Sequence, residues 1–166
     1  MGDDNKALDF YLKCFEMRSN LYKGDHPNLA ESLNSLGVSY TRLGDIHKAL
    51  KYKLKCFEMR SNLYKGDHPD LAESLNSLGV SYARLGDINK ALEYFMKCFE
   101  MRSNLYEGDH PDLAESLNSL ATSYERLGDD NKALEYDLKC FVMRSNLYKG
   151  DHPDLAESLN SLGISY

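Results

Sequence analysis

Residues 68–108 read HPDLAESLNSLGVSYARLGDINKALEYFMKCFEMRSNLYEG and carry the signals of two consecutive helices. Pro69 suits the first position of a helix, because that position needs no backbone N–H and proline presets φ. Apolar residues then recur at three- and four-residue steps, which is the pattern of a helix. Gly86 follows as a residue that readily adopts the positive φ of a helix C-terminus. We therefore predict a first helix over about residues 70–85, with these apolar residues: Leu71, Leu75, Leu78, Val80, Tyr82 and Leu85.

A second helix follows directly. Asp87 can cap its N-terminus, since a carboxylate accepts hydrogen bonds from the first backbone N–H groups of a helix. The helix is predicted to run from about Ile88 to Tyr106, and Gly108 is predicted to end it. No segment shows sustained alternation with period two, so we expect an all-α fold without β-strands. The predicted buried stripe of the second helix is Ala91, Leu92, Met96, Phe99 and Leu105.

The same unit recurs along the whole chain with a period of 42 residues, as the positions of Cys14, Cys56, Cys98 and Cys140 show. Residues 2–43 and 44–85 are identical at 35 of 42 positions. We therefore expect residues 1–166 to form a single repeat array, with units 2–43, 44–85, 86–127 and 128–166. The chain begins with a second helix (about 5–22) and ends in a first helix (153–166), which suggests an excerpt of a longer array.

The composition argues against several classes of protein. The chain of 166 residues has a formal net charge of −6 and no run of lysine or arginine, so a nucleic-acid partner is not expected. Its apolar stretches are too short for a transmembrane helix, so no membrane partner is expected either. The first residues lack the basic and apolar regions of a secretory signal, and we therefore predict a cytoplasmic protein.

The repeat resembles the tetratricopeptide repeat, whose signature is W-x₂-L-G-x₂-Y…A-x₃-F…P. The matching residues are Leu75-x-x-Leu78-Gly79-x-x-Tyr82, Gly86 and Ala91-x-x-x-Phe95. The resemblance implies an α-solenoid of antiparallel helix pairs that forms a right-handed superhelix. The segment from His68 to Leu78 is also similar to the longer repeats of kinesin light chains, and this similarity implies an intracellular adaptor that grips peptide motifs of other proteins.

Three departures from the signature have structural consequences. Leu75 stands where the signature has tryptophan. The closing proline is replaced by serine in every copy, so the second helix can continue for about two further turns. The phenylalanine of the signature is Phe95 in one copy only, and we expect its site to tolerate water. The replacements at these last two positions are Ser19, Ser61, Ser103 and Ser145 for proline, and Tyr11, Lys53 and Asp137 for phenylalanine.

Neither the cysteines nor the histidines indicate a chemical site. Each cysteine occupies the small-residue position of a second helix, so we expect buried free thiols. Each histidine precedes a proline at the start of a first helix, where capping and turn formation explain it, and the four do not converge as metal ligands would. No catalytic motif occurs, so we predict that the protein is not an enzyme and needs no cofactor. The histidines in question are His26, His68, His110 and His152.

The first helices carry the candidate binding residues, because in tetratricopeptide arrays these helices line a concave groove. On helix 70–85, Asn76 and Val80 lie four residues apart and share a face. An asparagine amide can donate to and accept from a peptide backbone, and arginine binds carboxylates through two parallel hydrogen bonds. Alternatively, the asparagines satisfy contacts between repeats, and the arginines and glutamates pair with each other. The candidate peptide-binding residues are Asn34, Asn76, Asn118, Asn160, Val38, Val80, Arg42, Arg84, Arg126, Glu73 and Glu115.

We therefore predict a protein–protein interaction scaffold that binds peptide segments of unknown identity in its groove. The groove is uniform along the array and is expected to discriminate poorly between ligands. The alternative is a structural or self-assembling rod, in which terminal helices of successive copies associate head to tail. Such heterologous contacts do not close on themselves and can propagate.

Overall fold

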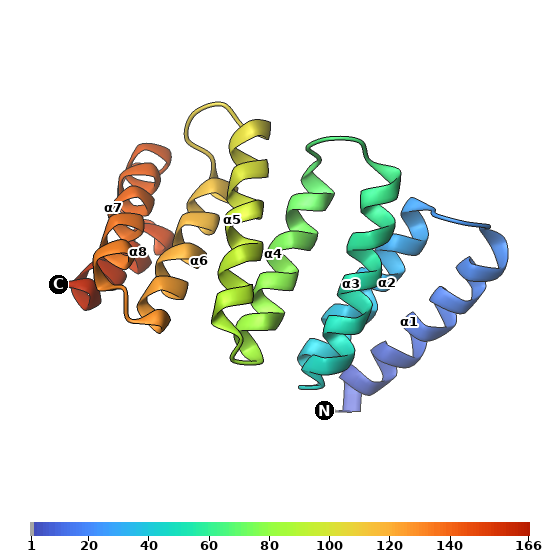
Figure 1. The fold of residues 1–166 in the computed structure, drawn as a ribbon. Helices are drawn as coiled ribbons and strands as arrows, with labels where there is room; N and C mark the ends of the chain where they lie inside the picture. The colour runs from blue at the N-terminus through green and yellow to red at the C-terminus, as the bar shows by residue number, and fades with distance from the viewer. Residues whose placement is uncertain (1) are drawn as a thin grey trace.

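The computed structural model describes residues 2–166, so Met1 of the predicted array lies outside it, and the described part contains eight helices and no strand. Figure 1 shows that these helices form two layers, with α3, α5 and α7 in front of α2, α4, α6 and α8. The expected all-α solenoid is therefore confirmed. The helices are α1 (Gly2–Leu21), α2 (Pro27–Arg42), α3 (Ile46–Leu63), α4 (Pro69–Arg84), α5 (Ile88–Leu105), α6 (Pro111–Leu127), α7 (Asp130–Leu147) and α8 (Pro153–Ser165).

We call the even-numbered helices A helices and the odd-numbered ones B helices. Each A helix is capped by the histidine before its proline: His68 Nδ1 accepts a hydrogen bond from the Asp70 N–H at 3.1 Å. The Tyr64 ring stacks on His68 with ring centroids 3.6 Å apart, which holds the imidazole in place. Asp87 caps the following B helix as predicted, accepting from the Lys90 N–H at 3.2 Å. These local contacts explain why the helices begin at equivalent residues in successive repeats.

The core is a continuous row of small clusters, each of which joins neighbouring repeats. In one cluster, Ala72 and Leu75 of α4 pack against Cys98 of α5 in the next repeat, and Phe57 of α3 packs against the same cluster. Leu78 is fully buried on the same face of α4. Because every pair of helices shares side chains with the next pair, the stability of the array rests on interfaces between neighbours.

An arginine also links each B helix to the next A helix; Arg60, Arg102 and Arg144 are buried, and Arg18 is partly exposed. Arg60 Nη1 donates to the backbone carbonyl of Asp70 at 2.8 Å and to Ser74 Oγ at 2.8 Å. It also forms an ion pair with Glu73 Oε2 at 3.0 Å. The same contacts to the carbonyl oxygen, the serine and the glutamate recur at the other three junctions, through Arg18, Arg102 and Arg144.

The site of the signature phenylalanine is buried in three of its four copies, so the expectation that it tolerates water was wrong there, whereas Tyr11 on α1 is 41% exposed. Lys53 and Phe95 are each 5% exposed and Asp137 is 6% exposed. Gly79 lies so close to Phe95 that an added Cβ would approach the ring to 2.6 Å, which explains the glycine of the signature. The burial of Lys53 and Asp137 is possible because neighbouring A helices offer them hydrogen-bond partners.

Candidate peptide-binding groove

A pocket of ≈ 400 Å³ lies between α4 and α6, on the A-helix side of the array. It brings together four of the predicted site residues from two neighbouring repeats, Val80 and Arg84 of α4 with Asn118 and Arg126 of α6. Phe95 of α5 lies between these two helices and also lines it. The complete lining is Val80, Ala83, Arg84, Phe95, Asn118, Ser119, Thr122, Ser123 and Arg126.

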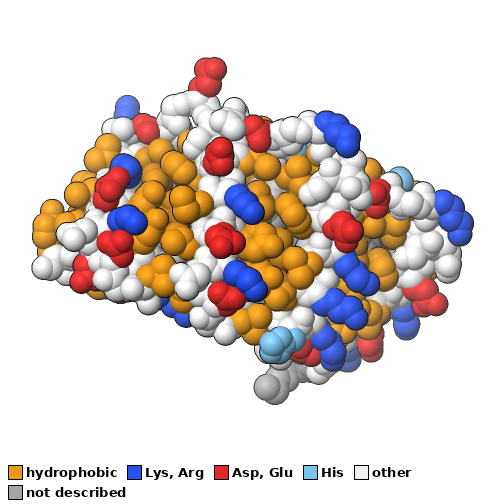
Figure 2. All heavy atoms as spheres, viewed as in Figure 1, with side chains coloured by type: hydrophobic (Ala, Val, Ile, Leu, Met, Phe, Trp, Pro, Cys, Tyr) orange, Lys and Arg blue, Asp and Glu red, His pale blue; other side chains and the backbone are white. Residues whose placement is uncertain are grey.

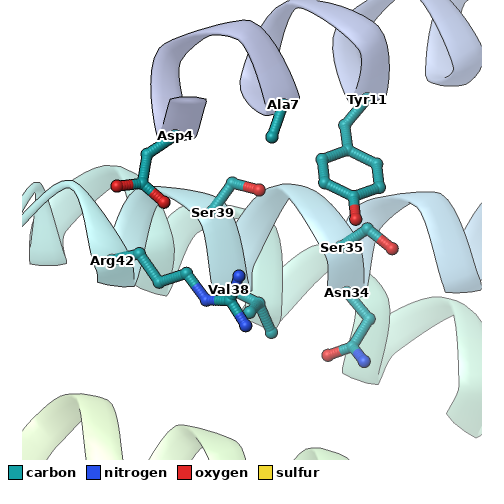
Figure 3. A pocket seen from close by; sticks show the side chains of 8 residues that line it. All are labelled: Asp4, Ala7, Tyr11, Asn34, Ser35, Val38, Ser39 and Arg42. Carbon is teal, nitrogen blue, oxygen red and sulfur yellow. The ribbon is translucent and has the colours of Figure 1, made fainter. Parts of the chain in front are cut away.

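A smaller pocket of ≈ 150 Å³ repeats this arrangement at α2 (Figure 3). Asn34, Val38 and Arg42 point from α2 in the same direction, away from α1. Tyr11 of α1 takes the place that Phe95 has in the larger pocket, and its hydroxyl points toward Ser35. We define the groove as the surface formed by the residues of the two pockets on α2, α4 and α6: Asn34, Ser35, Val38, Ser39, Arg42, Val80, Ala83, Arg84, Asn118, Ser119, Thr122, Ser123 and Arg126.

The α4–α6 pocket is positively charged although the chain as a whole is acidic. Arg84 and Arg126 are both exposed, and no carboxylate is among the residues that line this pocket. On the B-helix face, by contrast, basic and acidic side chains are interspersed (Figure 2). A pocket on that side contains both Lys97 and Glu100. The α4–α6 pocket therefore has the surroundings that an anionic group prefers.

Lys53 is a further positive charge beneath the groove. Its Nζ atom donates to Ser81 Oγ at 3.0 Å and to the Ser77 carbonyl oxygen at 3.3 Å, both on α4. Burial, and to a lesser extent the nearby charge of Arg84, lower the pKa of Lys53 from 10.5 to about 8. Among the described residues this ammonium group has no carboxylate partner, and it is bonded to the helix that carries Arg84.

The two predicted glutamates are engaged in ion pairs with other arginines than those of the groove. Glu73 pairs with Arg60 at 3.0 Å, and Glu115 pairs with Arg102 at 3.0 Å. Neither glutamate lines the α4–α6 pocket. The alternative prediction, that the glutamates pair with arginines, therefore holds at these two places. Their partners, however, are arginines of the B helices and not the candidate arginines of the A helices.

The remaining two asparagines differ in their surroundings. Asn76 Nδ2 donates to Glu115 Oε1 at 3.4 Å, which links two neighbouring repeats. The Oδ1 atom of Asn76 is buried and has no hydrogen-bond partner among the described residues. Asn160 is exposed on α8. Of the asparagine row, Asn34 and Asn118 are thus the members that line pockets.

The candidate site residues predicted from the sequence do not include the floor of the groove, which is formed by Phe95 in the larger pocket and by Tyr11 in the smaller one. From the sequence, this position is expected only to tolerate water. A signal was present, because this is the only position of the repeat that carries four different residues in four copies.

The described residues show neither a metal site nor a membrane-spanning element. Residues 2–166 contain no group of three or more histidine, cysteine, aspartate or glutamate side chains that could hold a metal ion. No helix in this range is both long and apolar enough to cross a membrane. All four cysteines are free, and burial raises the pKa of the thiols of Cys56, Cys98 and Cys140.

Comparison with known proteins identifies the repeat. A family model described as tetratricopeptide repeat matches residues 1–62, 36–104 and 70–141. No curated protein matches the sequence. A similar structure is that of the nearly identical TPR-like repeats of a protein from Podosopora anserina, described as a kinesin light chain. The two structures superpose with a TM-score of 0.87 and 19% sequence identity, and the match covers 99% of this chain and 78% of that chain. BtubC (BKLC) from P. vanneervenii is also similar, with TM-score 0.90, 22% identity, and coverage of 99% and 66%.

Proposed function

Because the chain belongs to the tetratricopeptide repeat family, whose repeats generally mediate protein–protein interactions, we propose that its groove binds extended, carboxylate-bearing peptide segments of a partner protein. The observation that carries this proposal is the α4–α6 pocket. It combines an amide from Asn118 with the guanidinium groups of Arg84 and Arg126. The amide can bond a peptide backbone, and each guanidinium can bind a carboxylate through two hydrogen bonds.

Arg84 and Arg126 of the groove are suited to a ligand because, among the described residues, the contacts that join successive helices do not involve them. These junctions are held by arginines of the B helices, such as the buried Arg60, which is already bonded to serine, glutamate and a carbonyl oxygen. Arg84 and Arg126, by contrast, are exposed. Replacing them should therefore affect binding more than folding.

The test begins with selection of linear peptides from a displayed random library on the immobilised protein. The affinity of a selected peptide is then measured for Arg84→Gln/Arg126→Gln and for Lys55→Gln/Lys97→Gln. Both variants lose two positive charges, but Lys55 and Lys97 are exposed on B helices. We expect the first variant to bind roughly tenfold or more weakly and the second to bind as the wild type does. Equal weakening by both would show non-specific electrostatic attraction and would end the proposal.

A further inference from the structure

The four copies of the repeat differ most where they face the groove. The floor position is Tyr11, Lys53, Phe95 or Asp137, whereas the neighbouring asparagine and arginine do not change. Two groove positions on the A helices also vary. The first is occupied by Val38, Val80, Thr122 and Ile164, and the second by Thr41, Ala83 and Glu125. The invariant groups can hold any peptide, so the varied groups are the ones that can make one junction differ from another. This corrects the expectation of a groove that is uniform along the array.

At two junctions the floor presents a charged side chain that is bonded to the next A helix. Lys53 bonds to Ser81 Oγ at 3.0 Å and to the Ser77 carbonyl oxygen. Asp137 Oδ2 accepts a hydrogen bond from Ser165 Oγ at 2.6 Å on α8. An apolar ligand side chain seated at either junction would lie against a charged group and would compete with its hydration or its hydrogen bonds.

The floor between α4 and α6 is apolar. Phe95 packs against Ala91 and Leu120 and is among the residues that line the ≈ 400 Å³ pocket. The serine hydroxyls of this pocket are bonded within their own helix: Ser123 Oγ donates to the Ser119 carbonyl oxygen at 2.7 Å. The walls add the apolar groups of Val80 and Ala83, so the pocket offers apolar surface that no described side chain covers.

We propose that the α4–α6 pocket receives one apolar side chain of the bound peptide and that Phe95 is the specificity-determining residue that places it there. The proposal rests on the proposed function and adds that the peptide binds in one fixed register along the array. At the α4–α6 junction, an apolar side chain of the peptide would meet the aromatic ring of Phe95. At the other two described junctions between A helices it would meet the ammonium group of Lys53 or the carboxylate of Asp137. The peptide is thereby positioned on one repeat of an otherwise repetitive groove.

The chain itself supplies a matched substitution. Phe95→Lys copies the residue that α3 already accommodates, because Ser119 and Ser123 are the equivalents of the two serines that bond Lys53. The reverse change, Lys53→Phe, gives the α2–α4 junction the same floor as the α4–α6 junction. Gly37, which faces Lys53, leaves the space that Gly79 leaves for Phe95.

The test measures coupling between Phe95 and the ligand, using a peptide selected on the wild-type protein and the same peptide with its apolar residue changed to alanine. The alanine change should weaken binding to the wild type roughly tenfold or more, as loss of one buried apolar side chain does. On Phe95→Lys the two peptides should bind equally weakly. Circular dichroism verifies the fold, and Phe95→Leu gives a second readout: a deeper pocket should shift selection toward larger apolar side chains.

Each other outcome overturns a stated part of the account. If Arg84→Gln/Arg126→Gln weakens binding but Phe95→Lys and Phe95→Leu change neither affinity nor selection, Phe95 does not determine specificity and the proposed function stands. If no peptide is selected, or neither the arginine nor the Phe95 variants alter binding, both proposals fail. Acquisition of a second peptide site by Lys53→Phe would further support the role of the floor.

Discussion

Arg60 Nη1 lies 3.0 Å from Glu73 Oε2, yet the arginine side chain is only 8% exposed and the glutamate is 56% exposed. The pair joins α3 to α4 within the repeat unit 44–85. Its two members are not equivalent, because the arginine also bonds the buried Ser74 and the backbone carbonyl oxygen of Asp70. The arginine is therefore the structural member of the pair and the glutamate its solvent-facing partner.

Replacing the two members should consequently have unequal effects on stability. Arg60→Met removes three hydrogen bonds of a buried charged side chain, and we expect a loss of about 2–3 kcal/mol. Glu73→Gln removes a partly exposed charge, and we expect a loss below about 1 kcal/mol. Urea unfolding followed by circular dichroism measures both values. Equal losses would show that the ion pair itself, and not the buried hydrogen bonds, holds the junction.

The buried Lys53 should make the stability of the array depend on pH. The pKa of Lys53 is about 8 in the folded protein, whereas the ordinary value, which applies to the unfolded chain, is 10.5. Between about pH 8 and pH 10.5 the unfolded state therefore binds more protons than the folded state. Stability therefore rises with pH across this window. From about pH 7 to about pH 9.5 the wild type should gain roughly 2 kcal/mol relative to Lys53→Met, because each pKa unit corresponds to about 1.4 kcal/mol.

Other titrating groups are common to the wild type and Lys53→Met, so the difference between their unfolding free energies isolates the lysine. A difference that stays constant over this pH range would mean that Lys53 remains charged and well solvated in the folded protein.

The four thiols should react at different rates. Cys56, Cys98 and Cys140 are buried, and burial raises the pKa of each, so the reactive thiolate is scarce and poorly accessible. Cys14 is only partly buried on α1. Alkylation with iodoacetamide, followed by mass spectrometry of peptides, should label Cys14 first. All four should react alike in denaturant; equal rates in the native protein would contradict the buried positions.

The histidine caps should contribute to stability individually. His68→Ala removes the acceptor for the Asp70 N–H and the stacking partner of Tyr64. We expect a loss of about 1 kcal/mol, whereas His68→Asp, which can also cap, should lose less. Thermal unfolding of the two variants compares them. Identical melting temperatures for His68→Ala and the wild type would show that the cap has no role.

Much of the fold could be predicted because its signals are local. His68, Pro69 and Asp87 act within one turn of their own helix, and Gly86 has the positive φ that its place after a helix suggests. Repetition then multiplied these signals along the chain. The bounds predicted for the second helix, about Ile88 to Tyr106, agree with Ile88–Leu105.

The buried polar groups could not be predicted in the same way. Arg60 reaches a glutamate 13 residues away and Lys53 a serine 28 residues away, so neither pairing follows from the periodicity of one helix. Charged residues at the position of the signature phenylalanine predict a site that is open to water. In the structure, hydrogen-bond partners on the next A helix allow Lys53 and Asp137 to be buried. The candidate groove residues on α2, α4 and α6 were located by resemblance, but the floor beneath them comes from the B helices.

The central claim is that a peptide binds in the groove, and NMR of the isotope-labelled protein with a selected peptide tests it most directly. The amide signals of residues 118–126 on α6 and of 80–84 on α4 should shift with saturation, while those of 97–104 on α5 should not. Shifts confined to the B helices, with the signals of α4 and α6 unchanged, would contradict the account.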